Sequence, residues 1–329
     1  MTHPLPSAVR ALAEADFGEV ARRFEGAGLK VALPARGIMT VRTGTADPAR
    51  ASVLLSVGVH GDETGPIEMV AYVLEALSRE PGALGVDLML CVGNIDAISQ
   101  GRRFIDADLN RMFRPERGSL AGTAEAARAD TMIAATTEFF AGAGPRRWHL
   151  DLHTAIRPSY YPAFAIVPDL VSGDRRTELV DWMGAAAIGA IIMNPSSAGT
   201  YSYYSAEHHG AAGATVELGR IGTLGNNDLA QFAHAQAAID ALLRGRPAGQ
   251  AHAQPHVFKV AQNIIKLSDS FVMNFGRETQ NFTSAPFGTV IATDGETIYT
   301  VEHDQEMIVF PNPDVRVGLR AGMMVVRVA

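Results

Sequence analysis

The sequence contains a single cysteine, Cys91, among 329 residues. One thiol cannot form an intrachain disulfide, so the sequence gives no support for an oxidising compartment. Cys91 falls within an apolar run over residues 87–92. This pattern predicts a thiol that is buried in a strand and contributes to packing.

The chain also lacks a long hydrophobic run. Its most apolar later stretch, residues 183–193, is too short and too rich in glycine and alanine to cross a bilayer. Residues 1–20 mix proline with charged side chains and show no basic region followed by an apolar stretch. We therefore expect a cytoplasmic protein that does not associate with a membrane.

Positive charge is in deficit, because 28 lysines and arginines face 35 acidic residues and leave a formal net charge of −7. A large basic surface is not expected, so nucleic acid is not a predicted partner. A locally basic pocket is still compatible with this balance. Hydrophobic residues make up 47% of the chain and charged residues 19%, which is typical of a globular protein with a substantial core.

Strand and helix patterns alternate over most of the chain. Residues 52–59 form a nearly continuous apolar run, typical of a strand buried on both faces, and apolar residues then repeat at helical spacing from residue 67 to 77. Further strands are expected within 29–46 and at 86–92, 148–152, 163–167, 190–193 and 214–218, further helices at 7–27, 123–140, 175–189 and 228–243, and a long loop at 194–213. The alternation predicts an α/β fold with a mostly parallel sheet covered on both faces.

The pattern changes after residue 245. Residues 246–255 are rich in Pro, Gly, Ala and Gln and show no periodicity, which indicates a linker. Beyond them, short β-rich runs alternate with turns and helical patterns disappear. We therefore predict an α/β domain over residues 1–245 and a small, mainly β domain over residues 256–329.

A candidate metal site begins with His60 and Glu63, three residues apart on a glycine-bounded turn after the strand at 52–59. Imidazole nitrogen and carboxylate oxygen both bind zinc readily, although this spacing alone is common. The carboxyl end of a buried strand favours a ligand site, because ligands bind there in open α/β sheets. His153 ends another apolar strand and is a candidate third ligand; the alternative is a hydrogen-bonded structural histidine.

Glu217 places a carboxylate within the apolar run at 214–218. Burying such a charge without a partner is costly. Glu217 therefore either faces solvent from an edge strand or serves as a functional group. A carboxylate beside a metal can take a proton from bound water and pass it to a leaving amine.

Residues 101–111 are dense in groups that recognise carboxylates, and the arginines clustered in and just after this segment are Arg102, Arg103, Arg111 and Arg114. A guanidinium fork can bind both oxygens of a carboxylate, and the adjacent Asn110 can add a directional donor. In an acidic protein this clustering favours an anionic substrate. The alternative is a solvated loop whose arginines pair with the neighbouring acidic residues.

Taken in chain order, HGDE, DADLNR, DLHT and VELG resemble the pattern of the zinc carboxypeptidase-like deacylases, the family that contains aspartoacylase and succinylglutamate desuccinylase. The resemblance covers nearly the whole chain and is closer to the desuccinylases in HGDETGPIE, NFTSAPFGTVIATDGE and FPNPDVRVGLRAGM. It implies a zinc-carboxypeptidase-like three-layer α/β/α fold with a mostly parallel mixed sheet, followed by the small β domain.

The resemblance also implies catalytic roles for residues of these motifs. One zinc ion per chain would be bound by His60, Glu63 and His153. Glu217 would be the general base and acid, and Arg103 would polarise the scissile carbonyl.

Substrate binding is implied for Asn110 and Arg111, which match the family's binders of the α-carboxylate. Asp108 would orient a ligand histidine by fixing its tautomer and ring direction. The resemblance does not identify the group that binds a distal carboxylate, for which the candidates are Arg157, Arg220 and Tyr299.

The function implied by the resemblance is hydrolysis of N-succinyl-L-glutamate to succinate and L-glutamate, the last step of arginine degradation by the succinyltransferase pathway. The residues by themselves indicate a metal, amide hydrolysis and a small anionic substrate. The alternatives are another deacylase such as an aspartoacylase, a true carboxypeptidase, or a non-catalytic zinc or anion-binding protein. Glu217 counts against the last, because binding alone needs no general base. The sequence does not decide the oligomeric state, and a homo-oligomer is compatible with it.

Overall fold

The computed structural model describes residues 4–44, 47, 49–276 and 278–328. Its strands up to the end of the predicted α/β domain are β1 (Lys30–Ala35), β2 (Ile38–Arg42), β3 (Ser52–Val57), β4 (Asp87–Val92), β5 (Arg147–Ala155), β6 (Phe164–Pro168), β7 (Ala190–Asn194) and β8 (Ala212–Arg220). The later strands are β9 (His256–Ile265), β10 (Val272–Met273), β11 (Thr283–Pro286), β12 (Val290–Asp294), β13 (Thr297–Thr300), β14 (Gln305–Val309) and β15 (Arg320–Arg327).

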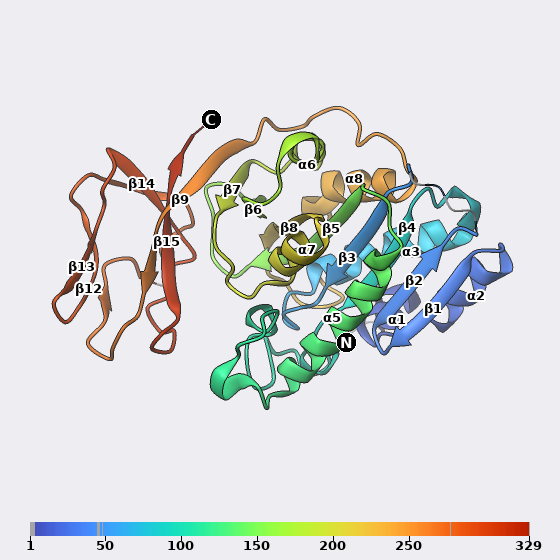
Figure 1. The fold of residues 1–329 in the computed structure, drawn as a ribbon, viewed down its shortest axis with the longest axis horizontal. Helices are drawn as coiled ribbons and strands as arrows, with labels where there is room; N and C mark the ends of the chain where they lie inside the picture. The colour runs from blue at the N-terminus through green and yellow to red at the C-terminus, as the bar shows by residue number, and fades with distance from the viewer. Residues whose placement is uncertain (1–3, 45–46, 48, 277, 329) are drawn as a thin grey trace.

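Within this described part, twelve strands form one mixed sheet in the order β1-β2-β4-β3-β5-β8-β6-β7-β9-β15-β14-β11 (Figure 1). The strands β4, β3, β5 and β8 run parallel, and every residue of β3 is buried. The chain continues from β3 to β4 on one side, whereas β5 lies on the other side. Such a switch in strand order opens a crevice at the carboxyl ends of the strands.

Helices cover both faces of the sheet. One face carries α1 (Ser7–Ala13), α2 (Gly18–Gly26), α3 (Gly65–Arg79), α4 (Ile95–Ser99), α6 (Gly173–Ala185) and α8 (Ala233–Leu243). The other face carries α5 (Ala124–Ala141) and α7 (Tyr201–His209) (Figure 1). Short 3-10 helices are η1 (Pro81–Ala83), η2 (Leu109–Arg111), η3 (Gly118–Leu120) and η4 (Leu229–Phe232). The predicted three-layer α/β/α fold with a mostly parallel sheet is confirmed.

Several boundaries differ from the prediction. The helix expected at 7–27 is two helices, because Ala15 adopts a positive φ of 60° and the Asp16 side chain accepts the Gly18 N–H. The loop expected at 194–213 contains α7, whose Tyr201 is fully buried and hydrogen-bonded to Thr136. Tertiary packing stabilises α7, and its sequence shows no helical repeat of apolar residues. Residues 45 and 46 of the strand region expected at 29–46 lie outside the described residues.

The sheet does not stop at the predicted linker. Strand β9 pairs in parallel with β7, from Ala190 beside His256 to Met193 beside Lys259. Phe164 and Phe258, from the two sides of the linker, share one buried cluster. The C-terminal β-rich part, at the left of Figure 1, also contains a small sheet of β10, β12 and β13. The domain boundary at residues 246–255 therefore stays a prediction.

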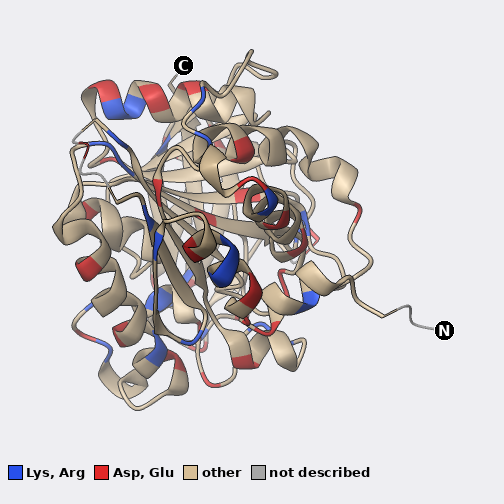
Figure 2. Cartoon of the chain, turned by 90° about the vertical axis from the view of Figure 1, so that its right-hand side faces the viewer, with Lys and Arg blue, Asp and Glu red and all other residues tan. Residues whose placement is uncertain are grey.

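Three composition-based expectations can be compared with the structure. Cys91 is buried in β4 as predicted, and burial raises the pKa of its thiol to about 11. None of the helices that the structure describes has the length and apolarity needed to cross a bilayer. Acidic and basic residues are interspersed over the face shown in Figure 2, with neither sign predominating.

Candidate active site

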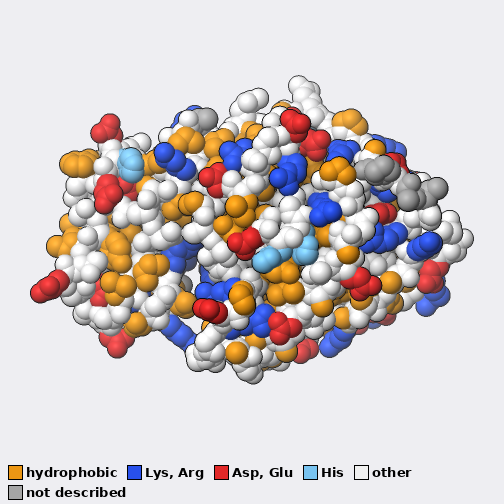
Figure 3. Space-filling model, viewed as in Figure 1, with side chains coloured by type: hydrophobic (Ala, Val, Ile, Leu, Met, Phe, Trp, Pro, Cys, Tyr) orange, Lys and Arg blue, Asp and Glu red, His pale blue; other side chains and the backbone are white. Residues whose placement is uncertain are grey.

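A cavity of about 640 Å³ opens where β3, β5 and β8 end. It is lined on one side by residues of these strand ends, including His60, His153 and Glu217, and on the other by residues of the C-terminal β-rich part, including Phe310 and Arg320. Figure 3 shows basic side chains gathered around a hollow between the two parts of the molecule. The cavity therefore brings together groups that are far apart in the sequence.

The three predicted metal ligands converge in this cavity. One donor atom from each of His60, Glu63 and His153 lies within 4.8 Å of the others, and all three residues are buried. Glu63 lies between the imidazoles, with Oε1 at 2.8 Å from His60 Nδ1 and Oε2 at 2.9 Å from His153 Nδ1. Two imidazoles and one carboxylate are a donor set that zinc takes in catalytic sites.

A carboxylate holds the far nitrogen of each imidazole. His60 Nε2 is 2.9 Å from Asp108 Oδ1, and His153 Nε2 is 3.0 Å from Asp151 Oδ2. Such contacts fix the tautomer and direct Nδ1 toward a metal, so the residues fit a zinc ion. Asp108 occupies the place predicted for it. Asp151 was not predicted, although residues two apart on a strand share a face and its place before His153 could have indicated it.

The carboxylates and imidazoles of this cluster shift one another's pKa values toward the charged forms. Burial tends to raise the pKa of Glu63, yet the two histidines hold it well below its ordinary value. Burial tends to lower the pKa of His153, yet Asp151 and Glu63 raise it well above the ordinary value. Glu63 is therefore a carboxylate at neutral pH, which is the form that binds a cation.

The turn that carries these ligands depends on Gly61. A Cβ at this position would lie 2.3 Å from the Ala97 carbonyl carbon, so only glycine lets the two segments approach. The Gly61 N–H donates to the Arg103 carbonyl oxygen at 3.0 Å. This contact brings the Arg103 side chain to the ligands, where Nη1 donates to Glu63 Oε1 at 2.7 Å.

The segment after Arg103 is held by Glu125, a residue that the sequence analysis did not single out. Its carboxylate is fully buried and accepts the N–H of Ile105 at 2.7 Å, the N–H of Ala107 at 3.2 Å and Asn94 Nδ2 at 2.9 Å. These bonds place Asp108 beside His60. In the sequence, Glu125 resembles any acidic residue in a first helical turn, so no local signal distinguishes it.

Only part of the arginine cluster lines the cavity. Arg103, Arg111 and Arg114 line it, whereas Arg102 does not. Asn110 is buried, with Oδ1 accepting the Tyr201 N–H at 2.8 Å. Its Nδ2 has only long contacts, at 3.4 Å to His153 Nε2 and 3.5 Å to Asp151, so this donor is weakly used.

Glu217 is not on an edge strand, which excludes the solvent-facing alternative. Strand β8 lies between β5 and β6, and Glu217 is beside His153 in the register with β5. The side chain is buried, and none of the residues that the structure describes forms a hydrogen bond with its Oε2. Burial, with a smaller contribution from the charge of Glu63, raises the pKa of Glu217 to about 7. A carboxylate with this pKa can exchange a proton near neutral pH.

Of the three candidates for a distal carboxylate, only Arg157 lines the cavity. Arg220 is exposed outside it, and the Tyr299 hydroxyl donates to the Ile265 carbonyl oxygen at 2.9 Å. Arg320, at the start of β15, lines the cavity and was not predicted. Its place could not be seen in the sequence, because it depends on how the C-terminal strands pack beside the α/β part.

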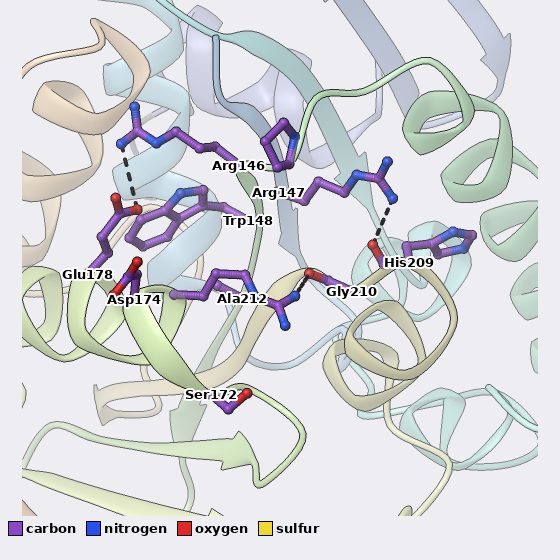
Figure 4. A pocket seen from close by; sticks show the side chains of 11 residues that line it. Arg146, Arg147, Trp148, Ser172, Asp174, Glu178, His209, Gly210 and Ala212 are labelled. Atoms are coloured by element: carbon purple, nitrogen blue, oxygen red, sulfur yellow. Dashed lines mark hydrogen bonds and ion pairs between the residues drawn. The ribbon is translucent and has the colours of Figure 1, made fainter. Parts of the chain in front are cut away.

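A second cavity, of about 650 Å³, lies at the amino ends of β5 and β8 (Figure 4). Its arginines are already bound. Arg146 pairs with Glu178 at 3.6 Å, Arg147 donates to the His209 carbonyl oxygen at 2.9 Å, and Arg175 donates to the Gly210 carbonyl oxygen. The one cluster of metal ligands found among the described residues lies in the carboxyl-end cavity, which is therefore the candidate active site.

Comparison with known proteins agrees with this geometry. Residues 49–243 match the family model described as the succinylglutamate desuccinylase/aspartoacylase catalytic domain. The chain belongs to the succinylglutamate desuccinylase/aspartoacylase family. Residues 253–328 match the model described as the AstE/AspA barrel-sandwich hybrid domain of the same family.

Relatives of this family include a succinylglutamate desuccinylase of Burkholderia orbicola (strain MC0-3), 42% identical over 88% of this chain and 85% of that protein. A solved structure named as the succinylglutamate desuccinylase of Vibrio parahaemolyticus has a TM-score of 0.84 and 31% identity, covering 92% of this chain and 89% of that one. That of Chromobacterium violaceum has a TM-score of 0.78 and 32% identity, covering 94% and 98%. Murine aminoacylase 3, 15% identical with a TM-score of 0.55 and covering 86% and 97%, shares the fold.

The family predicted from the four motifs is therefore confirmed, and the chain is an amidohydrolase. The motif residues of HGDE, DADLNR, DLHT and VELG meet in one cavity of this fold.

Proposed function

We propose that the chain hydrolyses the amide bond of N-succinyl-L-glutamate, giving succinate and L-glutamate, with one zinc ion per chain. This reaction is the last step of arginine degradation by the succinyltransferase pathway, to which we assign the protein. The observation that carries the proposal is the buried Glu217 beside the His60, Glu63 and His153 cluster, because its Oε2 has no hydrogen-bond partner among the described residues. The substrate is inferred from the relatives in Burkholderia and Vibrio, which are named as succinylglutamate desuccinylases.

His60 Nδ1, His153 Nδ1 and a Glu63 carboxylate oxygen would hold the zinc ion. When bound, zinc polarises a carbonyl and lowers the pKa of a water molecule. Asp108 and Asp151 keep both imidazoles directed at the metal position through their Nε2 atoms.

Glu217 accepts a proton from the attacking water and passes it to the departing glutamate nitrogen. Its raised pKa suits both halves of this transfer, since a strongly acidic carboxylate would accept the proton poorly. Arg103 carries its guanidinium at the ligand cluster, 2.7 Å from Glu63, where it can donate to the developing oxyanion.

Asn110 and Arg111 hold the substrate α-carboxylate in this proposal. Arg111 lines the cavity and its only acidic contact, to Asp108, is long at 3.9 Å. The weakly used Asn110 Nδ2 supplies a second donor. Fixing one end of the substrate turns the attack into a reaction within one complex, which lowers its entropic cost.

The test is an assay of the protein, with its zinc content measured, against N-succinyl-L-glutamate, N-acetyl-L-aspartate and a peptide with a free C-terminus. We expect the highest kcat/KM with N-succinyl-L-glutamate, loss of activity on chelation and recovery on adding zinc. Preference for N-acetyl-L-aspartate would indicate an aspartoacylase, and preference for the peptide a carboxypeptidase. Zinc binding without turnover of any of them would indicate a binding protein.

A further inference from the structure

Arg320 is the first residue of β15 and reaches the active-site cavity from the C-terminal β-rich part. Its backbone is fixed by strand pairing beside Ile265 of β9. The guanidinium has one weak contact, from Nη1 to Asn263 Oδ1 at 3.4 Å. Among the residues that the structure describes, no acidic side chain forms an ion pair with Arg320.

The charge of Arg320 is held in an unfavourable environment. Burial lowers the pKa of Arg320 to about 10, and the positive charge of Arg111 contributes in the same direction. A partly buried cation close to a second cation is destabilising unless an anion binds beside it. Proteins retain such arrangements mainly at functional sites.

A second donor lies in the same wall. Asn281 is fully buried and lines the cavity, and its Oδ1 accepts the Phe310 N–H at 2.8 Å. Its Nδ2 is a buried donor that forms no hydrogen bond within the part of the chain that the structure describes. Buried donors are nearly always satisfied, so this one indicates that a ligand supplies the acceptor.

We propose that Arg320, assisted by Asn281, binds a second substrate carboxylate, distinct from the one held at Arg111. The proposal rests on the proposed function, because N-succinyl-L-glutamate carries carboxylates on both sides of the amide bond. A carboxylate bound at Arg320 would give this cation an anionic partner and offset the repulsion from Arg111. An arginine fork with an amide donor is also the combination that Arg111 and Asn110 present in the same cavity.

The test compares wild type with Arg320→Gln on three substrates. N-Succinyl-L-glutamate has all carboxylates, N-acetyl-L-glutamate lacks the acyl carboxylate, and N-succinyl-L-glutamine lacks the side-chain carboxylate. We expect Arg320→Gln to lower kcat/KM for N-succinyl-L-glutamate about 100-fold, mainly through KM, because a charged partner in a desolvated site is lost. For the analogue that lacks the carboxylate bound by Arg320, the loss should be less than about threefold. Which analogue escapes the loss identifies the carboxylate.

Equal loss for all three substrates, or no loss for any, would overturn the proposal. Arg327→Gln is the matched control, because Arg327 is the exposed last residue of the same strand and lies outside the cavity. Arg320→Lys keeps the charge but not the fork, and should give a smaller loss of about tenfold with the same selectivity. If Arg320→Gln does not fold, Arg320→Lys decides by that selectivity.

The two proposals fail differently. Wild-type protein that turns over none of the three substrates would contradict the proposed function. Wild-type protein that is active, with variants that lose activity without regard to the carboxylates, would contradict only the role of Arg320.

Discussion

The two cavities of this protein have nearly the same volume, about 640 and 650 Å³, and arginines line both. They differ in whether their polar side chains already have hydrogen-bond or ion-pair partners. At the amino ends of the strands, backbone carbonyls and Glu178 take up the arginines. At the carboxyl ends, Glu217, Thr154 and Asn281 each have a buried polar atom that finds no hydrogen-bond partner in residues 4–44, 47, 49–276 and 278–328. Unsatisfied polar groups distinguish the reactive cavity.

This difference has a physical origin in the parallel strands. At their amino ends, the chain enters the sheet from helices, and arginines stabilise those turns by binding carbonyl oxygens. At their carboxyl ends, the loops present side chains to the crevice in which ligands bind. We therefore expect substitutions in the two cavities to act on different properties, stability at one end and catalysis at the other.

The largest effect on activity should come from the metal cluster. His153→Ala should lower kcat by about 1,000-fold or more, because it removes a ligand and with it the polarising metal. Zinc measured by elemental analysis should fall together with activity. Full zinc occupancy in this variant would show that His153 is not a ligand.

Glu217→Gln should separate metal binding from catalysis. The amide cannot accept a proton, so we expect a loss of at least about 100-fold in kcat with zinc and substrate binding retained. Steady-state assays measure kcat and KM, and metal analysis of the same sample measures the zinc content. Turnover close to that of wild type would exclude Glu217 as the general base.

The pH dependence of kcat/KM should show the ionisation of Glu217. Its pKa is raised to about 7, and the carboxyl group must be ionised to accept a proton. Activity should therefore fall as pH decreases through the pKa, about tenfold per unit, and a bound cation should move the midpoint below pH 7. Zinc content is measured at each pH as a control. Activity that rises between pH 7 and pH 5 would contradict this role.

The smallest effect on activity should come from the amino-end cavity. Arg147 donates to the carbonyl oxygens of Gly144, His209 and Ala143, so Arg147→Gln should lower the free energy of unfolding by about 1–3 kcal/mol. Activity at 25 °C should change less than twofold. Denaturant unfolding and the standard assay measure the two quantities.

Arg146→Gln is the matched control for this substitution. Arg146 is exposed and has one ion pair, with the exposed Glu178, so its loss should cost less than about 0.5 kcal/mol. If Arg147→Gln lowered activity strongly while leaving stability unchanged, the distinction between the two cavities would be wrong.

The sequence was sufficient to predict which candidate site residues lie at or near the ends of strands. His60, Glu63, His153 and Glu217 stand beside apolar runs whose order predicts a shared edge of the sheet. Local patterns carry this information because strands buried on both faces have a recognisable composition.

Contacts between distant segments could not be predicted in this way. Glu125 acts through backbone N–H groups of a preceding segment, and Arg320 reaches the cavity because β9 joins the sheet beside β7. Helix α7 was missed because burial of Tyr201 stabilises it. These features depend on tertiary packing, and the repeat of apolar residues along the chain carries no information about such packing.

The position of β15 has a consequence for folding. Although it comes after every other described strand in the chain, β15 lies between β9 and β14, and its first residue forms part of the cavity wall. Its pairings are nevertheless shorter in sequence than the pairing that gathers the metal ligands, because Arg320 pairs with Ile265 of β9, whereas Ser52 of β3 pairs with Arg147 of β5. Contacts that close shorter loops form faster. The strand pairing that carries Arg320 should therefore form before the metal ligands at the ends of β3 and β5 meet.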